Sequence, residues 1–145
     1  MKIIIDADAC PVYKHAVKIA EKYKVKCILV CDFNHILKVE YGEVVTVDKG
    51  RDNADFRIIS ILEAGDMVIT QDYGLASLVL SKDGHAMHHS GMLYSQDNID
   101  KLLFERFLSS KVRRSGQRTH NNKKFTEQNS ERFVEELTKW INSNI

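Results

Sequence analysis

The chain has 145 residues, of which 43% are apolar and 28% charged, with a formal net charge of +1 and one proline. This composition fits one globular domain with a sizeable core, and no apolar run reaches the ~20 residues of a membrane-spanning helix. The three cysteines form no C-x-x-C pair, so we expect reduced, buried thiols rather than a disulfide framework or a zinc ribbon. The start of the chain lacks the features of a secretory leader, and we therefore expect a cytoplasmic protein.

Apolar runs and helical periodicities alternate along the sequence. Strands are predicted by KIIID, KCILVCD, EVVTV, DMVITQD and HAMHH, at 2–6, 26–32, 43–47, 66–72 and 85–89. Helices are predicted over 11–24, 52–65, 75–84, 95–114 and about 126–142. The alternation predicts an α/β fold, a doubly wound and mostly parallel sheet with helices on both faces, as a single domain over 1–145 with additional C-terminal helices.

The helical periodicities also predict which side chains enter the core. In the second helix we expect Phe56, Ile59 and Ile61 or Leu62 to point inward, with Gly65 at the helix end. The inward positions of the last two helices are Ile99, Leu102, Leu103, Phe107, Phe133, Leu137, Trp140 and Ile141. The final helix is therefore predicted to dock on the body of the domain.

The charge is divided unevenly between the two ends of the chain. Residues 1–100 hold 11 Lys/Arg against 15 Asp/Glu, a balance of −4, whereas residues 101–145 hold 10 against 5, a balance of +5. The segment of about 111–124 is polar, basic and without periodicity, which predicts a basic loop. An acidic body with a basic extension is typical of an enzyme that uses a cation to act on a polyanion.

Aspartates follow three of the predicted strands. Asp6 ends the first strand, Asp52 comes just after the third and Asp72 ends the fourth, with Asp8 and Asp55 close behind in sequence. In a doubly wound sheet the carboxyl ends of the strands border the functional cleft, so we expect these carboxylates to converge. An all-oxygen cluster favours Mg²⁺ or Mn²⁺ over zinc. Helix capping is the competing interpretation for Asp8, Asp52 or Asn53, and Asp72, because each of these residues also lies near a predicted helix start.

Several motifs resemble one known family in order and spacing. IIIDADACPV, GRDNAD, GDMVITQDYGLA, SGMLYSQDNID and RRSGQRT resemble the YaiI/YqxD family of bacterial proteins over nearly the whole chain. That family looks like a branch of the PIN-like superfamily, and the KGRD and ITQD segments are similar to stretches of NYN ribonuclease domains. The resemblance implies a PIN-like fold, an acidic triad of Asp6, Asp52 and Asp72, and Asp8 and Asp55 as further metal ligands or supporting residues.

The hypothesis that follows is a Mg²⁺- or Mn²⁺-dependent nuclease acting on phosphodiester bonds. A metal ion held by the acidic residues would bind the phosphodiester and lower the pKa of a coordinated water. We expect a nucleic-acid partner, RNA ahead of DNA, held by basic side chains whose binding weakens as salt rises. The predicted nucleic-acid contacts are Lys49, Arg51, Arg113, Arg114, Arg118, Lys123 and Lys124.

Four other interpretations stay open at this point. A non-catalytic protein would use the same groups to bind a metal and RNA. A phosphatase of the haloacid dehalogenase type would use Asp6 as nucleophile, although Cys10 replaces the usual threonine of its D-x-D-x-T signature. Cys10 beside a helix start is itself a candidate nucleophile, with His15 nearby in sequence. A zinc site is the fourth possibility, and its candidate ligands are His85, His88, His89 and His120. Core packing or a surface position is the favoured interpretation for these histidines.

Overall fold

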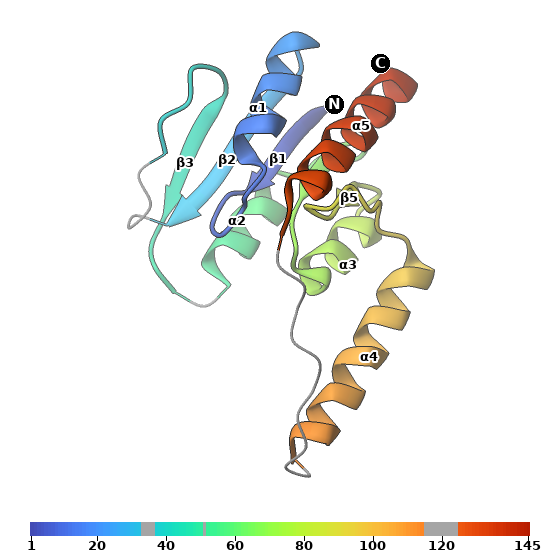
Figure 1. Cartoon of the computed structure of the whole chain (residues 1–145). Coiled ribbons are helices and arrows are strands. Elements are labelled where there is room, and N and C mark those ends of the chain that lie inside the picture. The colour runs from blue at the N-terminus through green and yellow to red at the C-terminus, as the bar shows by residue number, and fades with distance from the viewer. Residues whose placement is uncertain (33–36, 51, 115–124) are drawn as a thin grey trace.

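The structure, a computed structural model, describes residues 1–32, 37–50, 52–114 and 125–145, apart from the side chains of Arg113 and Arg114 (Figure 1). The strands are β1 (Lys2–Asp6), β2 (Lys26–Asp32), β3 (Glu43–Val47), β4 (Met67–Ile69) and β5 (His85–Met87). The helices are α1 (Tyr13–Lys22), α2 (Asn53–Ile61), α3 (Tyr73–Ser81), α4 (Gln96–Arg114) and α5 (Glu127–Asn144). The predicted alternation of strands and helices is confirmed.

The five strands form one sheet in the order β3-β2-β1-β4-β5. Every neighbouring pair is parallel, and Ile4 in the central strand β1 is level with Ile28 in β2 and Val68 in β4. The three central strands carry near-continuous apolar runs because helices cover both of their faces. The predicted doubly wound α/β architecture is therefore present, with a sheet that is parallel throughout.

Two apolar clusters lie on opposite faces of the sheet. Alternation along β1 sends Ile3 and Ile5 into one cluster and Ile4 into the other. The first cluster is completed by α1 and α5, and the second by α2, α3 and the first turns of α4 (Figure 1). Docking of the final helix is confirmed, since Phe133 and Leu137 are fully buried and Trp140 and Ile141 are nearly or fully so.

The inward face of α2 was predicted correctly in part, because Ile59, Ile61 and Leu62 are partly buried against the core whereas Phe56 is not. Phe56 is 72% exposed, and the fully buried side chain of this short helix is Ile58. The helix ends at Ile61, before Gly65, whose φ of +88° serves the turn into β4. Contact with the sheet selects the face of α2 that carries Ile58, and Phe56, two residues earlier, points to another side of the helix.

The inward face of α4 also differs from the prediction. Ile99 is fully buried and Leu102 half-buried, but Leu103 is 43% and Phe107 53% exposed. The Ser95 hydroxyl accepts the Asn98 backbone N–H at 3.2 Å and thereby caps the start of this helix. Beyond its first turns α4 extends away from the sheet, so no other element of the described part of the chain covers much of its apolar surface (Figure 1).

A buried ion pair links β1 and β4 at the amino edge of the sheet. The ammonium of Lys2 lies 2.6 Å from Asp66 and 3.0 Å from Glu63. Asp66 is 2% exposed and also accepts hydrogen bonds from the backbone N–H groups of Lys2 and Glu63. Burial by itself lowers the pKa of Lys2, but the bonds and charges of the two carboxylates raise it above its ordinary value overall.

Two further expectations concern the state of the cysteines and the presence of a membrane-spanning helix. Cys10, Cys27 and Cys31 are all buried thiols outside any disulfide, as predicted. In the described parts of the chain, no helix combines the length and the apolar character needed to cross a bilayer.

Candidate active site

The strand order places a crevice between the carboxyl ends of β1 and β4. The chain proceeds from β1 to β2 and β3 on one side and then crosses by α2 to β4 and β5 on the other. This reversal is the position at which doubly wound proteins bind ligands. Asp6 is the last residue of β1, and Thr70, Gln71 and Asp72 follow directly after β4.

Thr70 connects the ends of these two strands. Its hydroxyl donates to Asp6 Oδ2 at 2.8 Å and accepts from the backbone N–H of Asp72 at 3.0 Å. The side chain is fully buried, and its carbonyl oxygen accepts from the Tyr94 hydroxyl at 3.2 Å. The orientation of Asp6 is thus fixed by a residue whose role the sequence analysis did not predict.

Asp72 fulfils the capping interpretation as well as facing the crevice. Its Oδ1 accepts from the backbone N–H groups of Gly74 at 2.9 Å and Leu75 at 3.2 Å, at the start of α3. Only Oδ1 is used in these bonds. A carboxylate has further acceptor positions, so capping and ligand binding by Asp72 are compatible.

The other three aspartates lie at the ends of neighbouring elements. Asp52 precedes α2 with a left-handed φ of 65° and makes no side-chain capping bond. Asp55 is half-buried in the first turn of that helix. Asp8, in the loop after β1, accepts from the backbone N–H of Asp32 at 3.2 and 3.3 Å to its two oxygens. Capping therefore does not account for the position of Asp52 or Asp55.

The five aspartates share one electrostatic environment. Burial raises the pKa of Asp6 to about 6; the Thr70 hydrogen bond lowers it, while the carboxylates of Asp55, Asp8 and Asp72 raise it. The pKa of Asp55 is raised by burial and then by Asp72 and Asp52. In the described part of the chain, neither Asp6 nor Asp55 has a Lys or Arg within ion-pair distance. A proton or a cation would relieve this crowding.

The cluster is not a closed metal cage. Among the residues that the structure describes, no three His, Cys, Asp or Glu side chains come close enough together to hold one ion. Mg²⁺ commonly uses one or two carboxylates together with waters and substrate phosphates, and does not require a complete protein cage. The residues that could supply such oxygens are Asp6, Asp8, Asp52, Asp55 and Asp72.

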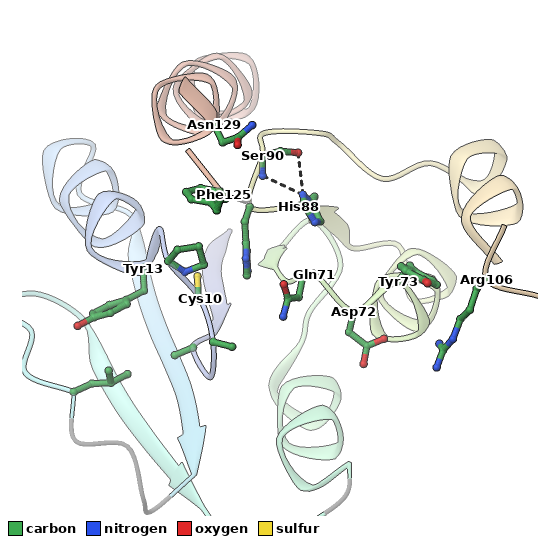
Figure 2. A pocket seen from close by; sticks show the side chains of 15 residues that line it. Cys10, Tyr13, Gln71, Asp72, Tyr73, His88, Ser90, Arg106, Phe125 and Asn129 are labelled. Carbon is green, nitrogen blue, oxygen red and sulfur yellow. Dashed lines mark hydrogen bonds between the residues drawn. The ribbon is translucent and has the colours of Figure 1, made fainter. Parts of the chain in front are cut away.

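A cleft of about 1300 Å³ lies beside this cluster, with Asp72 and Gln71 in its wall. Figure 2 shows Cys10 and Tyr13 on one side of the cleft and Asp72 with its neighbours in α3 and α4 on the other. The walls come from the loops after β1, β4 and β5, from α4 and from the start of α5. The space is large enough for a nucleotide-sized ligand.

Arg106, which the sequence did not point to, lies in the cleft beside Tyr73. The guanidinium of Arg106 in α4 lies over the Tyr73 ring, 5.8 Å from its centroid. Both residues line the cleft next to Asp72 (Figure 2). A sequence signal was absent because Arg106 reaches the site only through the packing of α4 on α3.

The surroundings of Cys10 favour the protonated form of its thiol. Burial raises the pKa of its thiol to about 12, although the backbone N–H groups of Val12 and Tyr13 act in the opposite direction. A thiol with such a pKa is protonated near pH 7. Burial of the thiol therefore disfavours the cysteine interpretation.

The histidines show packing and hydrogen bonding in place of a zinc site. His85 packs edge-on against Trp140, and His88 Nδ1 bonds to both the hydroxyl and the backbone N–H of Ser90. The pKa of His89 falls to about 4 through burial and the neighbouring His88. No group of three zinc-binding side chains is present in the described residues, and His120 lies outside them.

The predicted nucleic-acid contacts fall mostly where the structure gives no side chains. Lys49 is exposed in the turn after β3, close in sequence to Asp52. Arg113 and Arg114 belong to the last turn of α4, with side chains that are not described. The predicted contacts outside the described residues are Arg51, Arg118, Lys123 and Lys124. The Tyr94 ring is 3% exposed and is therefore not available for stacking on a base.

Comparison with known proteins supports a single family for the chain. Residues 4–143 match the family model described as "Uncharacterized BCR, YaiI/YqxD family". A UPF0178 protein of Clostridium kluyveri is 47% identical over 141 residues, which cover 97% of this chain and 93% of that protein. A UPF0178 protein of Bacillus cereus is 46% identical over 136 residues, which cover 92% and 93%. No solved structure matches the chain. The chain belongs to the YaiI/YqxD family.

Proposed function

We propose that this protein is a Mg²⁺- or Mn²⁺-dependent hydrolase of phosphodiester bonds in nucleic acid. The observation that carries the proposal is the gathering of aspartates from separate elements at the reversal of strand order, beside a cleft. Residues far apart in sequence raise one another's pKa there, an arrangement that costs free energy and is typical of functional sites. An ordinary set of helix caps would not require this mutual proximity.

Each aspartate has a role that follows from its surroundings. Asp6 and Asp55 are the principal metal ligands, because their carboxylates are the most crowded and the partly buried Asp6 is already oriented by Thr70. Asp72 would reach the ion through a bound water, with the oxygen that is free of capping, because no three acidic side chains of the described residues lie close enough to share one ion directly. Asp52 and Asp8 would adjust the charge at the rim. A bound divalent ion would supply an activated water and stabilise the charge that develops on the phosphate oxygens.

The ionisation of Asp6 sets the acid limit of activity. Only the carboxylate form of Asp6 is a good metal ligand, and its pKa is about 6. Metal binding and hydrolysis are therefore expected to fall as the pH drops through 6. A metal-bound Asp6 would titrate lower, so the limit moves to lower pH as the metal concentration rises.

The cleft supplies groups suited to a nucleotide next to the scissile bond. Arg106 offers a fork of donors for a phosphate, and Tyr73 offers a half-buried ring beside Asp72. Lys49 adds positive charge on the α2 side of the cluster. The basic residues of 113–124 supply further phosphate contacts in this proposal, with the salt dependence that counterion release predicts.

Cleavage of labelled single-stranded RNA and DNA with Mn²⁺ or Mg²⁺ tests the proposal. Asp6→Asn and Asp72→Asn should each reduce cleavage at least a hundredfold, because an amide can replace the hydrogen-bonding oxygen but not the charge. Asp83→Asn is the matched control. This exposed aspartate precedes β5 at the opposite edge of the sheet and should leave cleavage unchanged.

Other outcomes would identify a different function. Binding of RNA without cleavage by the wild-type protein, unchanged in Asp72→Asn, would replace the nuclease with a binding protein. Formation of an acyl phosphate on Asp6, trapped as its beryllofluoride analogue, would identify a phosphatase instead. Cleavage that survives Asp6→Asn at the wild-type rate would remove the aspartate cluster from the mechanism.

A further inference from the structure

Helix α4 presents an apolar face that no other described element covers. Leu103, Phe104, Phe107 and Leu108 are 43%, 60%, 53% and 45% exposed. These positions recur at the spacing of three and four residues that places side chains on one face of a helix. An exposed row of two phenylalanines and two leucines is typical of an interaction surface.

The opposite face of α4 is the one that packs on the domain. Ile99 is fully buried and Leu102 half-buried in the cluster that includes α3, and Arg106 reaches the Tyr73 ring. Figure 1 shows the C-terminal half of α4 extending away from the sheet. The four apolar residues are therefore available to a partner while the helix remains anchored through its other face.

Charged residues lie at the two ends of the same face in a self-complementary order. Asp100 precedes Leu103 by three residues, and Lys111 follows Phe107 by four, so both continue the apolar row. Both are exposed, and the ammonium of Lys111 lies 5.0 Å from the centroid of the Phe107 ring. Along α4, this face is therefore acidic at its start, apolar in its middle and basic at its end.

We propose that the occupant of this face is a second copy of the chain, bound through an antiparallel α4–α4 contact about a two-fold axis between positions 105 and 106. In this register Leu103 lies opposite Leu108 of the second copy, and Phe104 opposite its Phe107. Asp100 lies opposite Lys111 of the second copy, and the symmetry forms each contact twice. The same spacing places Asp97 opposite position 114, an arginine in the sequence.

The register is specific because the apolar pairs and the charged pairs are all centred on the same point, between positions 105 and 106. A parallel arrangement would place Asp100 near Asp100 and Lys111 near Lys111 of the second copy, which like-charge repulsion disfavours. The chain's own segment 115–124 is not a suitable occupant, because its sequence, SGQRTHNNKK, contains no large apolar residue. A second copy satisfies the apolar row and both charged ends together.

Charge exchange tests the proposal in the full-length protein. Light scattering after size exclusion and sedimentation should show a concentration-dependent dimer for the wild type. Asp100→Lys and Lys111→Asp should each weaken dimerisation at least tenfold, since either change sets like charges opposite each other twice. An equimolar mixture of the two variants should form a heterodimer, and the double variant should recover the homodimer.

Two phenylalanine variants test whether the dimer depends on the apolar face of α4 in particular or on exposed apolar side chains in general. Phe104→Ser should abolish the dimer without loss of helix content, because this side chain is exposed in the single chain. Phe56→Ser, at a phenylalanine of α2 that is 72% exposed, should leave the dimer intact. A wild-type protein that stays monomeric at high concentration, or a double variant that fails to recover the dimer, would overturn the proposal.

Discussion

Asp66 and Asp6 lie at opposite edges of the same sheet and have opposite electrostatic surroundings. Asp66, at the amino edge, is paired with the Lys2 ammonium at 2.6 Å and receives two backbone N–H groups. Asp6, at the carboxyl edge, has a threonine hydroxyl and three neighbouring carboxylates. The first arrangement satisfies a buried charge within the fold, whereas the second leaves negative charge for a ligand to satisfy.

The comparison teaches how to separate structural from functional carboxylates. Both residues are largely removed from water, so burial alone does not distinguish them. The two residues differ in what neutralising the carboxylate would remove. At Asp66 it would remove a favourable ion pair, and at Asp6 it would remove a repulsion between carboxylates. Mutations at the two edges should therefore change stability in opposite directions.

The largest expected effect is at the amino edge. Lys2→Met removes the positive charge and leaves the carboxylate of Asp66 buried without its ion-pair partner, which should lower the free energy of unfolding by about 3–5 kcal/mol. Urea unfolding measures the change. The control is Lys18→Met, at an exposed lysine of α1, for which we expect a change within about 0.5 kcal/mol. Equal effects of the two variants would show that the buried pair is unimportant.

The next effect has the opposite sign. The pKa of Asp6 is raised from 3.8 to about 6 by folding, so the folded state takes up a proton at a higher pH than the unfolded chain. This group therefore adds stability as the pH falls from above 6 towards 4, by at most about 3 kcal/mol. Asp6→Asn should be more stable than wild type at pH 7.5 and should lose this pH dependence. A destabilised Asp6→Asn protein would contradict the proposed repulsion.

Divalent cations should reproduce part of that stabilisation without mutation. At a Mn²⁺ concentration ten times the dissociation constant, selective binding to the folded state adds about 1.4 kcal/mol. Thermal unfolding with and without Mn²⁺, in a matched ionic strength of NaCl, measures this effect. We expect it in the wild type and in Asp83→Asn, and not in Asp6→Asn. An equal shift in all three proteins would place the cation elsewhere.

The smallest expected effect is a shift in the pKa of Asp6 when its hydrogen bond to Thr70 is removed. The Thr70 hydroxyl favours the ionised form of Asp6, so Thr70→Val should raise the pKa of Asp6 further. The lost hydrogen bond contributes about 1 kcal/mol to the free energy that favours the ionised form of Asp6. Titration of the side-chain carboxyl carbons by NMR measures the pKa directly. An unchanged Asp6 pKa would show that Thr70 serves only to hold the Asp72 backbone N–H.

The sequence analysis predicted the positions of the aspartates but not their partners. Strand ends are readable from apolar runs, and parallel strands bring their carboxyl ends to one edge, so the convergence of Asp6 and Asp72 was predictable. Thr70 was not, because its role depends on a hydrogen bond across 64 residues. Arg106 entered the cleft through helix packing for the same reason.

The errors in the helices also have a physical cause. Periodicity identifies an apolar stripe but not whether another element is present to cover it. Phe107 satisfied the pattern for a core residue, yet α4 extends beyond the sheet and leaves the ring 53% exposed. In α2 the pattern admitted more than one inward phase, and contact with the sheet selected Ile58 over Phe56.

The sequence by itself determined the alternation of strands and helices, the parallel sheet and the edge that carries the acidic residues, because these follow from local periodicity and from chain connectivity. The tertiary structure alone decided which carboxylates are compensated and which are crowded, and which apolar face of α4 is left open. Both depend on groups that are distant along the chain, and electrostatic free energy and burial are set by distance in space.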